Sequence, residues 1–271
     1  MLRQRVAVAI VGIPVTIGLT LLGGPLFTIA AGFVFAVAAL EYYAVTDPTS
    51  TAGSRRLFDP RLLGLIGAAG VALLVAAADN GFDWWTRALA LIVVLPFLPL
   101  ILWGDPQTGH RDWLWVIGGL MYVGFLGSHL VLLRDADNGR DWVLLALFAT
   151  FATDTAAYFI GRAVGRTKIT PSISPGKTLE GSLGGFAAGF GTVLILNWAL
   201  DAGAGAEIIP LAFLLPAVAE FGDLAESLIK RGAGVKDASQ VVPGHGGLLD
   251  RLDSLLFTIP RVYYYLTWII L

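Results

Sequence analysis

Charged and hydroxyl side chains gather near the C-terminus in a pattern that suits a phosphate or metal site. Four residues of "EFGDLAESLIKR" are linked by spacings of three or four, which places them on one face of a helix: Glu220, Asp223, Ser227 and Lys230. Glu226 lies at the edge of this face. In the plain alternative, the helix end reaches the lipid headgroups and Glu226 pairs with Lys230. Asp223 lies deeper in an apolar run, which favours a metal- or phosphate-linked role for it.

A second polar stretch, "VKDASQVVPGHGGLLDRLD", contains a shaped loop. Its Pro-Gly-His-Gly-Gly run is incompatible with a regular helix, because proline lacks an N–H donor and glycine permits unusual backbone angles. Such a loop brings backbone N–H groups close to an anion. A helix is expected to start near Leu248, with Asp250 and Asp253 one turn apart. The charged neighbours of His245 favour a functional role over a solvated loop histidine.

The third polar stretch is the connection 161–180, which contains "SPGKT". A P-loop is excluded because Pro171 takes the place of the first glycine and no strand precedes the motif. Arg162 and Arg166 are explained by the preference of basic residues for the cytoplasmic side and by contact with anionic lipid. The "SPGKT" cluster is less easily explained in this way. Asp154 lies within the preceding apolar run, so it is a functional candidate too.

The composition predicts an all-α, polytopic integral membrane protein. Of the 271 residues, 56% are hydrophobic and only 14% are charged, whereas soluble domains carry about 25% charged residues. The basic start and long apolar run of residues 1–24 favour a first membrane helix over a cleaved signal peptide. About nine apolar stretches are long enough to span a bilayer: 6–22, 25–44, 61–78, 87–103, 113–133, 141–160, 181–200, 207–229 and 252–271.

The distribution of basic residues predicts the orientation. With a cytoplasmic N-terminus, 14 of the 18 Lys and Arg residues fall in segments that face the cytoplasm. This arrangement places the polar connections 161–180 and 230–251, and hence the polar site, at the cytoplasmic face of the cell membrane. The C-terminus is then expected outside. Glycines 181, 185 and 189, four residues apart, suit either close helix packing or a subunit contact in a homodimer.

The sequence predicts a single membrane domain over 1–271, in which 1–140 are mainly scaffold helices and 150–260 form the catalytic region. Because the chain has no cysteine, disulfides and thiolate metal sites are excluded, and its carboxylates favour Mg²⁺. The net charge of -2 excludes a broadly basic surface that would bind nucleic acid. The implied reactants are polyanions, one of them a membrane lipid.

Residues 227–253, "SLIKRGAGVKDASQVVPGHGGLLDRLD", resemble the signature of the phosphatidate cytidylyltransferases, also called CDP-diacylglycerol synthases. The upstream stretches "DTAAYFIGRAVGR" and "ISPGKTLEGSLGG" are similar to that family as well, so the resemblance covers about residues 150–260. It implies an Mg²⁺-dependent membrane nucleotidyltransferase of phospholipid biosynthesis. Such an enzyme joins CTP and phosphatidic acid, giving CDP-diacylglycerol and pyrophosphate.

The resemblance implies a cation centre of one or two Mg²⁺ ions at Asp223 and Asp250. The predicted catalytic residues are Asp223, Lys230, Lys236, Asp250 and Arg251. The predicted substrate-binding residues are Ser174, Lys177, Thr178, Ser227, Arg231, His245, Gly246 and Gly247. Supporting roles are predicted for Asp154, Glu226, Asp237 and Asp253.

Two other functions stay open on the sequence. A related CTP-dependent transferase could act on another lipid phosphate, because acyl and prenyl chains both lie in apolar grooves. An ion-coupled transporter could line its pathway with Glu41, Asp154 and the group around Asp223. The location of the charges on one side of the membrane and the absence of a convincing internal repeat argue against the transporter.

Overall fold

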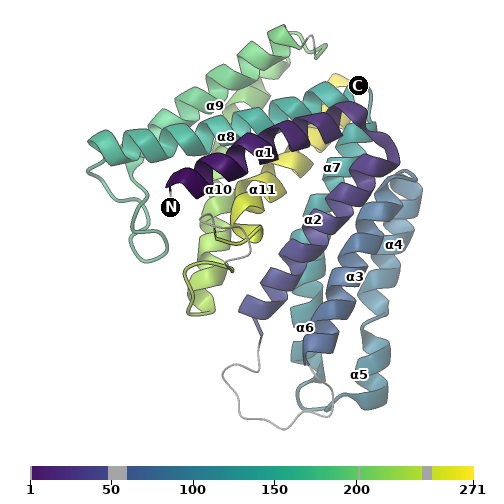
Figure 1. The fold of residues 1–271 in the computed structure, drawn as a ribbon. Coiled ribbons are helices and arrows are strands. Elements are labelled where there is room, and N and C mark those ends of the chain that lie inside the picture. The colour runs from purple at the N-terminus through teal and green to yellow at the C-terminus, as the bar shows by residue number, and fades with distance from the viewer. Residues whose placement is uncertain (1, 48–59, 201, 240–245) are drawn as a thin grey trace. The chain divides into compact units, whose positions relative to one another are not determined.

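The structure, a computed structural model, describes residues 2–47, 60–200, 202–239 and 246–271. These residues are mostly helical (Figure 1). The helices are α1 (Leu2–Leu22), α2 (Gly24–Val45), α3 (Pro60–Ala78), α4 (Phe82–Val94), α5 (Phe97–Trp103), α6 (Gly109–Gly119), the π-helix η1 (Leu120–Phe125), α7 (Leu126–Asp135), α8 (Gly139–Val164), α9 (Leu179–Ala199), α10 (Ile208–Gly232), α11 (Leu249–Tyr265) and the π-helix η2 (Leu266–Ile270). An antiparallel β-bridge joins Lys168 and Thr178. The predicted all-α fold class is confirmed.

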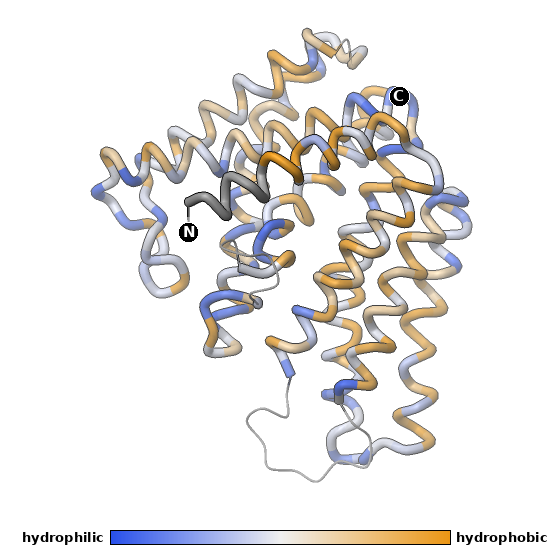
Figure 2. Tube along the Cα trace, viewed as in Figure 1, coloured by the Kyte–Doolittle hydropathy of each residue, from blue (hydrophilic) through white to orange (hydrophobic). Residues whose placement is uncertain are grey.

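Seven helical segments within the described ranges are long and apolar enough to cross a bilayer. They are Gly24–Val45, Arg61–Ala78, Phe82–Trp103, Gly109–Asp135, Gly139–Val164, Leu179–Ala199 and Ile208–Gly232. Each corresponds to one predicted span, including the acid-rich stretch 207–229. Hydrophobic residues make up most of the length of these helices, while hydrophilic residues gather at their ends and in the connections (Figure 2). The protein is therefore a polytopic membrane protein. The predicted total of nine spans stays a prediction, because α1 offers only the shorter apolar stretch Ile10–Leu22 and α11 has 17 residues.

The chain divides into two compact units. Unit 1 comprises Met1–Leu132 and Ala233–Asp250, and unit 2 comprises Leu133–Gly232 and Arg251–Leu271. The first boundary lies near the predicted division at residue 140. Unit 1, however, also includes the segment 233–250, which we had assigned to the catalytic region. The prediction of a single membrane domain stays a prediction.

Unit 1 is built around α2 and α3, which pack side by side (Figure 1). Tyr43 of α2 is buried, and its hydroxyl donates a hydrogen bond of 2.7 Å to the carbonyl oxygen of Val116 in α6. Its ring occupies space that a methyl group would fill at Gly67 of α3 or Gly119 of α6. Two glycines thus let three helices close around one aromatic side chain.

Unit 2 is built around α8, α9 and α10. The glycines at 181 and 185 let α9 approach the backbone of α8: a Cβ atom would lie 2.7 Å from the carbonyl oxygen of Ala157 at Gly181, and 2.7 Å from that of Thr153 at Gly185. A Cβ at Gly189 would overlap Thr153 and Pro216 of α10. The glycine spacing therefore serves helix packing within the chain, one of the two expected uses. The predicted homodimer stays a prediction.

We expect Gly185→Ala to destabilise the protein, because the new methyl group would overlap a backbone oxygen that has little freedom to move. The cost of such overpacking is about 1–3 kcal/mol. Gly191→Ala, on the same helix, is the matched control because no atom lies within 4 Å of its would-be Cβ. Thermal unfolding of both purified variants in detergent measures the effect. Equal midpoints for the two variants would contradict the packing.

Candidate active site

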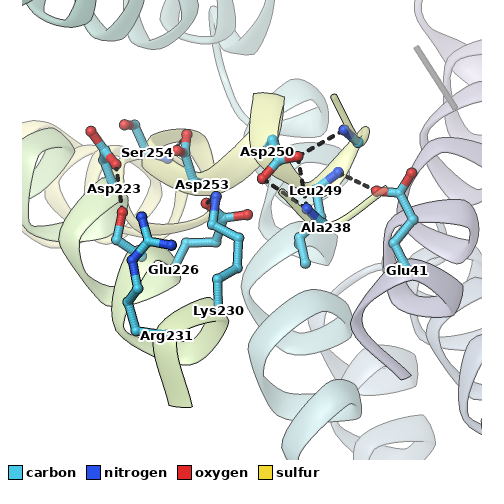
Figure 3. A network of polar contacts seen from close by, with 12 residues as sticks. Glu41, Asp223, Glu226, Lys230, Arg231, Ala238, Leu249, Asp250, Asp253 and Ser254 are labelled. Atoms are coloured by element: carbon cyan, nitrogen blue, oxygen red, sulfur yellow. Dashed lines mark hydrogen bonds and ion pairs between the residues drawn. The ribbon is translucent and has the colours of Figure 1, made fainter. Parts of the chain in front are cut away.

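Unit 2 brings acidic side chains together where α10 meets α11. Gly222 makes this contact possible, because a Cβ there would lie 2.8 Å from the backbone oxygen of Asp253 and 3.0 Å from the Cα of Ser254. The next residue, Asp223, consequently lies near Asp253, and the two carboxylates repel each other (Figure 3). Two like charges in an apolar surrounding are costly unless cations or donors compensate them.

Asp223 has two such partners in the described structure. Its Oδ2 lies 3.1 Å from the Nζ of Lys177, and its Oδ1 accepts a hydrogen bond of 3.3 Å from the hydroxyl of Ser227. The Nζ of Lys177 also donates to the carbonyl oxygen of Glu220 at 3.0 Å. The lysine of the "SPGKT" stretch is thus joined to the acidic face of α10.

The connection 165–178 is held in shape at several points. The carboxylate of Glu180 accepts hydrogen bonds from the backbone N–H groups of Arg166 and Thr167, at 3.0 and 3.2 Å. The hydroxyl of Thr178 accepts from the N–H of Gly181, which caps the N-terminus of α9. Thr178 is buried. This capping role was not part of our prediction, and its predicted contact with substrate stays a prediction.

The end of α10 contributes two more cations. Arg231 donates from Nε to the carbonyl oxygen of Ile173 at 3.1 Å, which ties the connection 165–178 to α10. Lys230 lies 2.7 Å from Glu226, four residues earlier on the helix (Figure 3). The Glu226 side chain is 0% exposed and that of Lys230 is 12% exposed. The expected pairing exists, but it is a buried ion pair, in contrast to the exposed pair at the headgroups that the plain alternative describes.

Asp154 of α8 completes the acidic group of unit 2. Its Oδ1 accepts a hydrogen bond of 3.3 Å from the hydroxyl of Ser254 in α11. It interacts electrostatically with Asp253 and Asp223. Helices α8, α10 and α11 therefore direct carboxylates to one region of unit 2. Asp154, a functional candidate from the sequence, is one of them.

Unit 1 contains the other part of the signature, 233–250. Asp250 is buried, and it accepts hydrogen bonds from the N–H groups of Gly247 at 2.7 Å and Ala238 at 3.1 Å. Gly246 has a positive φ of 85°, and a Cβ there would lie 2.8 Å from Asp250. The predicted non-helical backbone is confirmed at Gly246, and α11 begins at Leu249, next to the predicted start. Asp250 thus shapes the loop, in addition to its predicted role as a metal ligand.

Glu41 of α2 joins this segment and is absent from the predicted site. It is buried and accepts hydrogen bonds from the N–H groups of Leu248 and Leu249 and from the hydroxyl of Ser239. A signal was present in the sequence, because a carboxylate within an apolar stretch such as 25–44 is expected to have a partner. We had considered Glu41 only for the transporter alternative.

The predicted site residues fall into both units. Unit 2 holds Asp154, Ser174, Lys177, Thr178, Asp223, Glu226, Ser227, Lys230, Arg231, Arg251 and Asp253. Unit 1 holds Lys236, Asp237, Gly246, Gly247 and Asp250. Lys236, Asp237, Arg231 and Arg251 are exposed, and Ser174 is half-buried. His245 lies outside the described residues. The predicted metal pair, Asp223 with Asp250, is divided between the units and stays a prediction.

The donor set suits Mg²⁺, although the described ranges contain no group of three or more acidic or histidine side chains arranged to hold a metal ion. Asp223 offers a carboxylate that is one-third exposed, with a serine hydroxyl beside it. Mg²⁺ commonly binds through one or two carboxylates, with waters and substrate phosphates filling the other positions. A site that gains ligands from substrate agrees with this arrangement.

Comparison with known proteins shows the family of this chain. The sequence pattern of the "Cytidylyltransferase family" matches residues 3–269. A phosphatidate cytidylyltransferase of Brucella suis is 35% identical over 265 residues, which cover 97% of this chain and 92% of that protein. Those of Pseudomonas aeruginosa and a Synechocystis strain are each 33% identical, covering 99% and 97% of this chain and 97% and 95% of their own lengths.

The chain therefore belongs to the cytidylyltransferase family. The similarity extends over nearly the whole length, including the first half, for which the sequence motifs gave no residue-level match. The resemblance recognised in residues 227–253 is confirmed.

We expect Lys230→Met to destabilise the protein strongly, because it leaves the buried carboxylate of Glu226 without its ion-pair partner. Breaking a buried pair from one side costs about 3–5 kcal/mol. The double variant Glu226→Leu/Lys230→Met removes both charges and should recover most of the lost stability. Thermal unfolding in detergent distinguishes these cases. A single variant as stable as the wild type would show that the pair is not needed to bury Glu226.

Proposed function

We propose that this protein is a phosphatidate cytidylyltransferase of the cell membrane, with its site at the cytoplasmic face. The observation that carries the proposal is the pairing of Lys177 with Asp223 in unit 2 of a chain that belongs to the cytidylyltransferase family. Cations and a partly exposed carboxylate at the end of a membrane helix suit a reaction between a nucleotide and a lipid phosphate. The excess of basic residues in 161–180 and 230–251 supports the cytoplasmic orientation.

The reaction joins two polyanions. A phosphate oxygen of phosphatidate attacks the α-phosphorus of CTP, forming a new P–O–P linkage, while the bond from the α-phosphorus to the bridging oxygen breaks and pyrophosphate leaves. A phosphomonoester is largely dianionic at neutral pH, since its second pKa is about 6. The total charge is therefore the same on both sides, and the nucleophile needs no general base.

Electrostatic repulsion is the main barrier that the residues must overcome. Two unit charges 4 Å apart repel by about 1 kcal/mol in water and by about 4 kcal/mol near a protein surface. Lys177, Lys230 and Arg231 would bind the phosphates, and their fixed positions would orient the two reactants. The pairing of Lys177 with Asp223 in unit 2 keeps both charges compensated without substrate.

Mg²⁺ is part of the proposal. Asp223 of unit 2 would hold it, with Asp250 as the further predicted ligand from the signature. When bound, the ion supplies positive charge against the developing negative charge of the transferring phosphate and the leaving pyrophosphate. Asp154 and Asp253 would orient the cations around it.

Incubation of the purified protein with CTP, phosphatidate and Mg²⁺ should yield CDP-diacylglycerol and pyrophosphate, which thin-layer chromatography and mass spectrometry identify. Chelation with EDTA should stop the reaction and added Mg²⁺ should restore it. Turnover with polyprenyl phosphate but not with phosphatidate would instead establish the related transferase. Ion uptake into liposomes without nucleotide would support the transporter.

Asp223→Asn should lower the rate of CDP-diacylglycerol formation by about 100-fold or more, because it removes a charge that binds the metal and positions Lys177. Asp83→Asn, at an exposed carboxylate near the start of α4, is the control and should keep full activity. Both variants should unfold at the wild-type temperature within a few degrees. Wild-type turnover in a folded Asp223→Asn protein would remove Asp223 from the metal site.

A further inference from the structure

Glu41 makes an unusual set of contacts for a residue of a membrane-spanning helix. Its side chain is 5% exposed, and its two carboxylate oxygens accept three hydrogen bonds from the signature segment. Oε1 accepts from the hydroxyl of Ser239 at 2.6 Å and from the N–H of Leu248 at 3.1 Å. Oε2 accepts from the N–H of Leu249 at 2.7 Å. All these residues belong to unit 1, so the contacts lie within one compact body.

Two of the three donors are backbone N–H groups at the start of a helix. Leu248 and Leu249 are at the N-terminus of α11, where backbone N–H groups have no partner within the helix and where a negative charge is favoured by the helix dipole. Ser239 lies on the other side of the segment 240–245. A single carboxylate therefore joins both flanks of this segment. Charge-assisted hydrogen bonds to backbone N–H groups are stronger than neutral ones.

The local sequence leaves room for this carboxylate. A Cβ at Gly247 would lie 2.6 Å from Oε2 of Glu41 and 3.1 Å from the Cβ of Ala238. Gly247 is therefore needed for the approach of Glu41, in addition to any role in substrate binding. Asp250 binds the same flanks through Ala238 and Gly247. Two buried carboxylates, Glu41 of α2 and Asp250 of α11, thus bind the residues on both sides of 240–245, namely 238–239 and 247–249 (Figure 3).

We infer that Glu41 is a positioning residue for the cytidylyl-transfer site: it fixes the two flanks of the loop within the signature and the first turn of α11. For its effect on catalysis the inference rests on the proposed function. Glu41 touches no reacting atom, so it acts through Ser239, Leu248 and Leu249. The first half of the chain then contributes to the site and is not scaffold alone.

The test compares Glu41→Gln, Glu41→Ala and the control Asp79→Asn in the full-length protein. Asp79 also accepts a hydrogen bond from α2, from the hydroxyl of Thr28 at 2.6 Å, but far along the helix from Glu41. In hydrogen–deuterium exchange, both Glu41 variants should accelerate exchange in peptides that cover 246–252, with the larger effect for alanine. Peptides from α3 should be unchanged, and Asp79→Asn should leave 246–252 unchanged.

The kinetic arm measures kcat and KM for CTP per folded molecule. Glu41→Gln should lower kcat/KM by roughly 10- to 100-fold at an unchanged unfolding temperature, because small displacements of catalytic groups cost rates of this order. A merely structural role would reduce the folded fraction and leave kcat and KM of the remaining enzyme at wild-type values. Ser239→Ala removes one of the three hydrogen bonds and should give a smaller loss of kcat/KM. If the Glu41 variants fail to fold, this variant tests the inference in their place.

Wild-type exchange in 246–252 for Glu41→Gln, or faster exchange with wild-type kcat/KM, would overturn the inference. Reduced kcat/KM without any change of exchange would also overturn it, because the effect must pass through the anchored backbone. If the wild-type protein forms no CDP-diacylglycerol, the proposed function fails. The exchange measurement would still decide whether Glu41 anchors the segment.

Discussion

The cost of burying a charge in an apolar chain governs the arrangement of this protein. Only 14% of its residues are charged, yet Glu41, Glu226 and Asp250 are all buried. A buried carboxylate is tolerated only when cations or N–H and O–H donors surround it. Glu226 has Lys230, while Glu41 and Asp250 have backbone N–H groups. Each acid thereby fixes the segment that supplies its partners, and the polar segments acquire defined shapes without a large soluble domain.

These contacts also explain how opposite charges coexist at the site without neutralising one another completely. Asp223 is paired with Lys177 but remains one-third exposed, so its carboxylate stays accessible to a cation. The side chain of Glu226, by contrast, is fully buried and pairs with Lys230. The carboxylate of Asp223 can therefore exchange its partner for a cation at lower cost than that of Glu226, since charges nearer to water interact more weakly. Burial thus distinguishes the carboxylate of Glu226, which maintains the fold, from that of Asp223, which is open to a ligand.

Much of the helical architecture and the acidic face of α10 could be predicted from the sequence, because apolar length and i,i+4 spacing are local properties. The spacing of four residues also allowed a pair between Glu226 and Lys230, which was one of the two alternatives for Glu226 that the sequence left open. The link from Lys177 to Asp223 and the contacts of Glu41 could not be predicted, since they join residues that are tens or hundreds of positions apart. The cap formed by Thr178 was missed because a hydroxyl in a basic loop was interpreted only as a ligand for phosphate. The number of spans depends on α1 and α11, whose apolar stretches are short.

The anchoring of the signature segment by Glu41 has a consequence for biogenesis. During translation, Glu41 enters the bilayer about 200 residues before Ser239 and Leu249 have been synthesised, given separations of 198 and 208 positions. For that interval the nascent chain carries a carboxylate in an apolar helix without its eventual donors. Completion of unit 1 must therefore wait for the C-terminal part of the polypeptide, so a chain interrupted before residue 239 leaves a costly carboxylate in an apolar helix without these donors.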